Sequence, residues 1–364
     1  MKFLIYVGHP AQYLFFKNII ISLLEKNHKV VLLLKTKDVL ESLVKSDGFQ
    51  YINVLPHVRG NSKFSIIYNL IKRNLRILPI IIKEKPDLLI GGDPSISQLG
   101  WLLRKNRITL TEDDYPIIKK LADITFPFAQ AIICPNVCDA GKWSYKKIGY
   151  DGYMKLSYLH PKVFQLNDKI LEKYKIIDKY ALIRLAKLTA HHDFGIRGIN
   201  ESLLDEIIFT IEKKNIKVYI SSEYELKERY HKYILNIQPS DIHQLLGFSE
   251  ILISDSQSMS VEAAILGVPS IRYSDFAGKI SVLEELEHKY LLTFGFPINQ
   301  HKQLISKLNN LIEDANLKKV FTERQIEMLE DKINVSAFFT WFILNWPNSF
   351  NIMKENPEYQ FNFK

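Results

Sequence analysis

The sequence has no long apolar segment and very few cysteines. No window reaches about 18 uninterrupted apolar residues, so we expect no membrane-spanning helix. The first residues, MKFLIYVGH, are strand-like, and they lack the longer apolar core and the cleavage site of a signal peptide. The two cysteines, Cys134 and Cys138, are too few for a disulfide framework, and a single C-x3-C is a poor zinc signature. We therefore expect structural thiols in a reducing compartment, the cytoplasm.

The sequence also lacks low-complexity segments and the marks of a nucleic-acid-binding protein. Its 364 residues are 47% hydrophobic and 24% charged, which is a globular composition of a length that suits two domains. The formal net charge of +8 favours contact with an anionic group, such as a phosphate or an acidic lipid surface. The lysines are scattered, however, and no basic run is interleaved with aromatics, so we expect no nucleic-acid partner. The sequence leaves the oligomeric state open.

What the sequence does contain is a regular alternation of short apolar runs and amphipathic helical patterns. Strand-like runs such as FLIYVG (residues 3–8) and AIICP (131–135) are separated by helical segments such as residues 62–85. The alternation restarts near residue 180 with KYALIRL. Because strands that alternate with helices form right-handed β-α-β units, we predict an α/β fold with two parallel sheets.

The predicted domains cover residues 1–160 and 178–335. The segment between them contains His160-Pro161 and a charged run. The last residues, 336–364, begin in the aromatic stretch FFTWFILNWP, and we expect them to cross back to the first domain. Open α/β sheets bind ligands outside the carboxyl ends of their strands. We therefore predict two sheets that face a central cleft, with functional residues directly after strands.

Several polar residues follow strands of the first domain. His9 can act as a general base on a hydroxyl, or it can simply bond to its own loop. Asp93, in GGDPS, can orient hydroxyls or act as a base, or it can form a turn. In TEDDY, three sheltered carboxylates would repel and raise a pKa, whereas Pro116 also suits a solvated helix N-terminus. We expect one of the three carboxylates, such as Glu112 or Asp114, to be functional and the others to cap.

The loop TAHHDFG follows the first strand of the second domain. Its His191 and His192 can donate hydrogen bonds to phosphate oxygens, or one of them can act as an acid. A zinc site would need a third ligand that the sequence does not supply, so we expect no metal. The nearby basic residues Arg184 and Lys187 are candidates for stabilising a departing phosphate.

The stretch DSQSMSVEAAILGVP begins a helix directly after a strand. The free N–H groups of such a helix end form an anion site, to which Ser256 and Ser258 can add hydroxyl donors. Glu262 lies about one turn deeper and can accept two vicinal hydroxyls, as a ribose offers. The alternative is a helix cap formed by Asp255 or Ser256. Capping explains the first turn, but it does not explain a carboxylate within an otherwise small and apolar helix.

This stretch resembles the donor-nucleotide motif of the glycosyltransferase-B (GT-B) superfamily. The nearest pattern is that of the UDP-N-acetylglucosamine 2-epimerases, roughly D-S-G-G-I-Q-E-E-A-x-x-L-G-x-P. The resemblance implies that Ser256 and Ser258 contact phosphate and that Glu262 holds the uridine ribose. Gln257 and Ser258 replace the two family glycines, which implies a stiffer loop. GGDPS also resembles the family's G-D strand end, and TAHHDFG resembles T-x-H-R-x-E-N-F-G, which places His191 on the family histidine.

Other segments depart from the epimerase pattern. GHPAQ replaces G-T-R-P-E and resembles the first loop of inverting glycosyltransferases, in which a histidine deprotonates the acceptor. Glu112 matches the glutamate of V-E-A-G-L-R, but the next catalytic glutamate has no counterpart. The whole chain, including YDGYMKLSYLHP, also resembles an uncharacterised archaeal and bacterial family of unknown function with this predicted fold.

These features predict a metal-independent glycosyltransferase with two Rossmann-like domains of the GT-B type. A nucleotide-sugar, expected to be UDP-linked, would be the donor, and no cofactor is expected. His9, or a carboxylate of residues 112–114, would deprotonate a glycan or lipid-linked acceptor of surface polysaccharide biosynthesis. The positive charge and the aromatic C-terminus would suit peripheral contact with the inner face of the membrane.

Two alternatives remain. One is a UDP-N-acetylglucosamine 2-epimerase, in which Asp93 and either Glu112 or Asp114 would move the proton at C2. The other is a non-catalytic protein that binds a nucleotide-sugar. Turnover of UDP-N-acetylglucosamine without an acceptor would distinguish the epimerase from the transferase, because a transferase would show at most slow hydrolysis.

Overall fold

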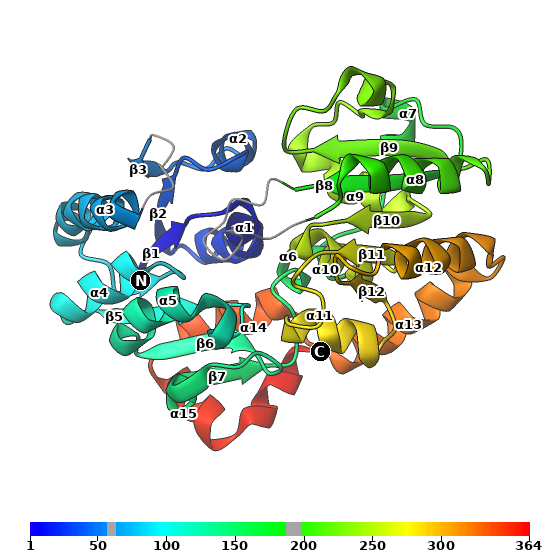
Figure 1. The fold of residues 1–364 in the computed structure, drawn as a ribbon. Helices are drawn as coiled ribbons and strands as arrows, with labels where there is room; N and C mark the ends of the chain where they lie inside the picture. The colour runs from blue at the N-terminus through cyan, green and yellow to red at the C-terminus, as the bar shows by residue number, and fades with distance from the viewer. Residues whose placement is uncertain (57–62, 187–197) are drawn as a thin grey trace. The chain divides into compact units, whose positions relative to one another are not determined.

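The computed structural model describes residues 1–56, 63–186 and 198–364, which form two compact α/β units (Figure 1). Unit 1 comprises Met1–Val163 and Lys332–Lys364, and unit 2 comprises Phe164–Asp331. Both ends of the chain therefore belong to unit 1, and unit 2 is an insertion within it. Among the described residues, no helix has both the length and the apolar character to cross a membrane.

Unit 1 is built on a parallel sheet of seven strands in the order β3-β2-β1-β4-β5-β6-β7. Every pairing is parallel, which confirms the predicted fold class. The last strand was not predicted, because its sequence KIGY is short and contains Lys and Gly, which are poor strand formers. The strands are β1 Lys2–Val7, β2 Lys29–Lys35, β3 Ile52–Leu55, β4 Leu88–Ile90, β5 Asn106–Leu110, β6 Ala131–Pro135 and β7 Lys147–Tyr150.

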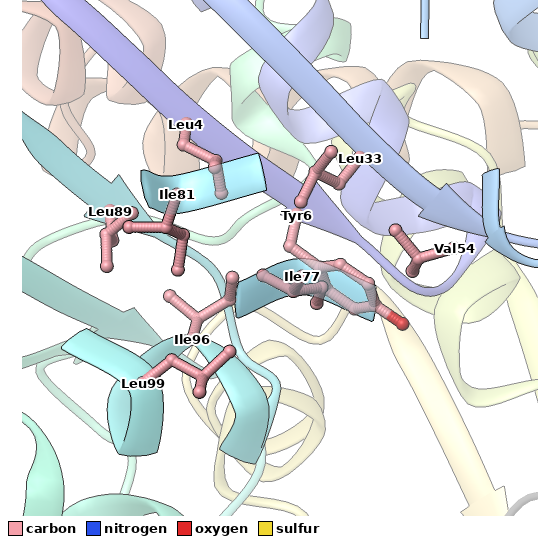
Figure 2. Packing of buried hydrophobic residues seen from close by; sticks show 9 residues of the cluster. All are labelled: Leu4, Tyr6, Leu33, Val54, Ile77, Ile81, Leu89, Ile96 and Leu99. Atoms are coloured by element: carbon pink, nitrogen blue, oxygen red, sulfur yellow. The ribbon is translucent and has the colours of Figure 1, made fainter. Parts of the chain in front are cut away.

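Helices cover both faces of this sheet. On one face, α3 and α4 pack against alternate residues of β1, such as Leu4 and Tyr6 (Figure 2). On the other face α1 packs against α14, with the rings of Phe15 and Phe339 4.8 Å apart. The helices are α1 Pro10–Glu25, α2 Leu40–Ser46, α3 Lys63–Glu84, α4 Pro94–Leu102, α5 Tyr115–Thr125, α6 Leu156–Leu159, α14 Val335–Leu344 and α15 Asn348–Glu355.

The aromatic C-terminal segment is part of the core of unit 1. Phe338, Phe339 and Phe342 in α14 are at most 1% exposed, and Phe339 packs edge-on against Tyr150 of β7. The expectation that this stretch offers its aromatic side chains to a membrane is therefore wrong for these three residues. The helix that precedes it in the chain, α13 Leu317–Asp331, belongs to unit 2, whereas α14 belongs to unit 1.

Unit 2 has a smaller parallel sheet in the order β12-β11-β10-β8-β9. Its strands are β8 Tyr180–Leu185, β9 Lys217–Ser222, β10 Ile251–Ser254, β11 Ser270–Tyr273 and β12 Thr293–Phe296. Its helices are α7 Lys169–Lys173, α8 Glu201–Glu212, α9 Ile242–Phe248, α10 Gln257–Ile265, α11 Ser281–His288, α12 His301–Glu313 and α13 Leu317–Asp331. The strand β12 was not predicted, because TFGF is short and contains a glycine.

Candidate functional site

The predicted residues of the first domain lie at the carboxyl edge of the unit 1 sheet. The strands β1, β4 and β5 are neighbours, so His9, Asp93 and Glu112 follow adjacent strands. Gly92 permits this close spacing, because a Cβ atom at that position would lie only 2.8 Å from the carbonyl oxygen of Leu110. The parallel topology thus gathers three residues that lie far apart in the sequence.

His9 is the N-cap of α1. Its Nδ1 accepts a hydrogen bond from the backbone N–H of Ala11 at 3.3 Å, and its side chain is exposed. Desolvation by nearby protein atoms lowers the pKa of His9 to about 4, and the charge of Lys37 adds to the shift. The ring is therefore neutral at physiological pH. With Nδ1 as an acceptor, the neutral ring carries its proton on Nε2.

Asp93 is held in place on two sides. It is the N-cap of α4, where Oδ1 accepts from the backbone N–H of Ser95 at 2.9 Å. The same oxygen lies 2.9 Å from Nη2 of Arg73, a buried cation that also donates from Nε to Ser95 Oγ at 2.8 Å. The structural alternative for Asp93 was a turn, and in the structure the residue is instead a helix cap. Its carboxylate is also held by the cation of Arg73.

Glu112 forms a buried ion pair with Lys155. The two side chains are 10% and 9% exposed, and Glu112 also accepts from the backbone N–H of Met154 at 2.5 Å. Lys155 was not predicted from the sequence, where it stands within the apolar stretch YMKLSYL. A lysine in such surroundings requires a partner when it is buried, and this was the one available signal.

Asp114 has a separate partner, so the acidic triplet does not share one site. Its Oδ1 accepts from the backbone N–H of Asp139 at 2.7 Å, and the residue is only 5% exposed. It precedes α5 as the N-cap, yet its side chain makes no capping hydrogen bond. The expectation of a solvated helix N-terminus is therefore wrong for Asp114, whose carboxylate holds a neighbouring loop instead.

In unit 2, the N-terminus of α10 lies at the carboxyl end of β10. Ser256 is the N-cap, and its Oγ accepts from the backbone N–H of Met259 at 3.4 Å. Ser258 is half-buried in the first turn. Of the two capping residues considered from the sequence, the structure thus has Ser256 and not Asp255.

Asp255 contacts Ala186 and Gly198, two described residues of unit 2. It is 2% exposed, and Oδ1 accepts from the backbone N–H of Ala186 at 2.7 Å. A Cβ atom at Gly198 would lie 2.5 Å from Oδ2, so only glycine fits there. Burial raises the pKa of Asp255 to about 6. The predicted residues Lys187, His191 and His192 fall between these two contacts and lie outside the described residues.

Glu262 is buried in the second turn of α10, at 5% exposure. One carboxylate oxygen lies 3.3 Å from Nε2 of His243, which is on α9. The sequence offered no signal for this histidine, because a single His on a short helix is ordinarily a core residue. The pair places a carboxylate and an imidazole side by side next to the serine-rich helix end.

Arg272 is a second residue that the sequence analysis missed. It is fully buried in β11, and its Nη1 donates to Oε1 of Gln257, the first residue of α10, at 2.8 Å. Its Nη2 lies 3.5 Å from Glu287, and its Nε has no hydrogen-bond partner within the described residues. Desolvation lowers the pKa of Arg272. A buried cation therefore adjoins the positive end of the helix dipole, and both favour an anion.

Arg184 is paired within its own sheet. Its Nη1 donates to Ser221 Oγ at 2.7 Å, and its Nη2 pairs with Glu223. Its predicted role at a departing phosphate would therefore require release from Glu223. In the described parts of the chain, no three His, Cys, Asp or Glu side chains are grouped so that they could hold a metal ion.

Solved structures with the same fold cover nearly the whole chain. The S. aureus MnaA–UDP co-structure aligns with a TM-score of 0.67 and 15% identity over 96% of this chain and 97% of that one. UDP-GlcNAc 2-epimerase from Neisseria meningitidis bound to UDP-GlcNAc gives 0.66 and 15%, over 94% and 100%. Spinosyn forosaminyltransferase SpnP gives 0.62 and 13%, over 94% and 99%. These likenesses confirm the predicted GT-B type of fold.

A search of the curated proteins found no match to the sequence. A family model described as "Protein of unknown function (DUF354)" matches residues 1–335, which is most of the chain. The chain therefore belongs to the DUF354 family.

Proposed function

We propose that this protein is a metal-independent glycosyltransferase that binds a nucleotide-sugar at the N-terminus of α10. The observation that carries the proposal is the set of groups around that helix end. Ser256 and Ser258 are in its first turn, and the buried Arg272 reaches its first residue. A diphosphate would gain the helix N–H groups, the serine hydroxyls and this positive charge.

The buried Glu262 would then bind the ribose. A carboxylate accepts two hydrogen bonds from vicinal hydroxyls, and Glu262 lies one turn deeper than the serines. His243, at 3.3 Å, would hold the carboxylate in position. Support for a UDP-linked donor comes from the solved structures with this fold, since one contains UDP and another UDP-GlcNAc.

His9 is the proposed base for the acceptor hydroxyl, which would belong to a glycan or a lipid-linked acceptor of polysaccharide biosynthesis. Its ring is neutral at physiological pH because its pKa is lowered to about 4. To accept a proton on Nε2, the ring must first carry its proton on Nδ1 and release the 3.3 Å contact to Ala11. That contact is long, so its loss costs little.

A 2-epimerase is the second candidate. In its favour, Asp93 and Glu112 follow adjacent strands, and several solved structures with this fold are UDP-GlcNAc 2-epimerases. Against it, both carboxylates are engaged by cations, Arg73 and Lys155. Incubation with UDP-GlcNAc alone separates the candidates, because an epimerase forms the 2-epimer and a transferase releases at most a little UDP.

The binding site is tested by calorimetric titration of the full chain with UDP, CMP, GDP and dTDP, in the absence of metal. We expect one nucleotide to bind in the micromolar range. Glu262→Gln keeps the size of the side chain but removes its charge, and we expect roughly 10–100-fold weaker binding. The matched control is Glu313→Gln on α12, whose side chain is 55% exposed and pairs with Lys214.

The contrary result is equally clear. If no nucleotide binds, or if Glu262→Gln binds as well as the control, the serines of α10 are only a helix cap and the proposed donor site is wrong. Nucleotide binding without turnover of any nucleotide-sugar would instead favour the non-catalytic alternative.

A further inference from the structure

The outer face of α3 is apolar, although it is open to solvent. Tyr68, Ile71, Leu75 and Ile82 are 63%, 54%, 66% and 57% exposed. The opposite face is the one that packs on the sheet, through Ile77 and Ile81 (Figure 2). A helix that is apolar on both sides is ordinarily buried on both sides, and the described residues of the chain leave this outer face uncovered.

The apolar residues of this face have the spacing of a coiled-coil seam. Tyr68, Ile71, Leu75, Leu78 and Ile82 are separated by three, four, three and four residues. Of these five, Leu78 is partly buried and also packs against the core beneath the helix. This is the a and d pattern, by which one helix packs its side chains between those of another. None of the five seam residues is charged. With a rotation of about 100° per residue along the helix, Lys72 and Lys83 both lie on one flank of the seam. The other flank faces α4, to which Asn74 is hydrogen-bonded.

The exposed apolar surface continues from α3 onto α4. The two helices lie side by side on one face of the sheet, joined by the bond from Asn74 to Gln98 at 3.1 Å (Figure 1). The last residues of α4, Trp101 and Leu102, are 56% and 60% exposed. Together the six exposed side chains present on the order of 700 Å², close to the roughly 800 Å² per partner of a stable interface.

We propose that this face, made of the α3 seam with Trp101 and Leu102, joins two copies of the chain in a symmetric dimer. Three of the five seam residues, Tyr68, Leu75 and Ile82, are self-complementary about Leu75. A two-fold axis there brings Leu75 against its own copy and Tyr68, seven residues before it, opposite Ile82 of the second copy, seven residues after it. An acidic lipid surface is the alternative occupant, because Lys72 and Lys83 flank the seam, and binding to phosphatidylserine vesicles would reveal it.

Light scattering coupled to size-exclusion chromatography tests the dimer with the full chain across the micromolar range. We expect a dimer for the wild type and a monomer for Leu75→Glu, with at least a 100-fold weaker dimer. The matched control is Phe209→Glu, since Phe209 on α8 is 68% exposed but is the only exposed apolar residue of an acidic helix face. This control should remain a dimer.

Cross-linking tests the geometry even where Leu75→Glu fails to fold. Leu75→Cys should form an intermolecular disulfide under mild oxidation, because the two copies of this position meet at the axis. Ile82→Cys alone should not, as its two copies lie far apart. The native Cys134 and Cys138 are buried and do not interfere.

A monomeric wild type, or equal cross-linking of both cysteine variants, would overturn the proposal. A monomer that binds phosphatidylserine vesicles and loses that binding in Leu75→Glu would assign the face to lipid. The proposal does not depend on the nucleotide-sugar activity, because its readouts involve no nucleotide.

Discussion

The carboxyl edges of the two sheets hold their buried charges in different ways. In unit 1, Asp93 after β4 is paired with Arg73 and Glu112 after β5 is paired with Lys155, whereas Asp114 accepts from a backbone N–H group. In unit 2, Asp255 accepts from backbone N–H groups and has no cation beside it in the described residues. Two carboxylates of the first edge are therefore already neutralised by cations, whereas the charge of Asp255 at the second edge depends on pH.

The same contrast appears in the response of the two units to pH. The pKa of His9 is lowered to about 4, so the unfolded chain binds more protons between pH 4 and 6.5, and this group makes stability rise with pH in that window. The pKa of Asp255 is raised to about 6, so the folded chain binds more protons between pH 4 and 6, and stability falls as pH rises. The two contributions have opposite signs over nearly the same range.

The largest effect is expected at His9. His9→Asn keeps an oxygen that can cap α1 but removes the proposed base, so we expect kcat to fall by roughly 10²–10⁴-fold. The measurement is turnover with the nucleotide-sugar that binds, alongside thermal unfolding. His9→Ala should lose the same activity with little loss of stability, because the 3.3 Å cap contact that it removes is weak. Full activity in His9→Asn would reduce His9 to a helix cap.

The next effect concerns the buried pair of unit 1. Lys155→Met leaves the carboxylate of Glu112 buried without its cation, and we expect a loss of about 3–5 kcal/mol in the free energy of unfolding. The double variant Glu112→Gln, Lys155→Met should recover most of that loss, since no charge is then left unpaired. Urea unfolding measures both. A single variant as stable as the wild type would show that the pair is not closed in solution and that Glu112 is available as a catalytic base.

The smallest effect is expected at Asp255. Because its carboxyl group holds its proton more tightly in the folded chain, we expect Asp255 alone to lower the free energy of unfolding by about 2 kcal/mol as pH rises from 4 to 6, while His9 acts in the opposite direction. Asp255→Asn cannot ionise but can still accept from Ala186, so this part of the pH dependence should disappear. Urea unfolding at intervals between pH 4 and 7 measures the slope. An unchanged slope would mean that another group dominates this window, and the contrast between the two edges would fail.

The sequence was sufficient for the architecture because the alternation of apolar runs and helices is a local signal. Strand ends are also local, which is why His9, Asp93 and Glu112 could be placed directly after strands, whereas the adjacency of those strands is known only from the structure. The partners could not be predicted, because they come from distant parts of the chain. Lys155 follows Glu112 by more than 40 residues, and the pairing depends on how β5 and the segment after β7 lie in three dimensions.

The burial and the partners of individual side chains also could not be predicted from the sequence. Glu262 reads as an open ribose ligand, but burial and His243 decide how it is held. Arg272 looks like an ordinary residue of a short strand, and only its complete burial beneath α10 marks it as part of the site. From the sequence, Asp255 is a candidate helix cap, whereas in the structure its carboxylate accepts a hydrogen bond from the backbone N–H of Ala186.

The insertion of unit 2 within unit 1 sets the order in which the protein can fold during its synthesis. The core of unit 1 includes α14, which packs on α1, so it stays incomplete until Lys332–Lys364 has left the ribosome. At a synthesis rate of about 5–20 residues per second, the apolar surface of α1 stays uncovered by α14 for roughly 10–40 s after Val163 has been made. Unit 2 is contiguous and can fold first, and the nascent first unit is the part that we expect chaperones to shield.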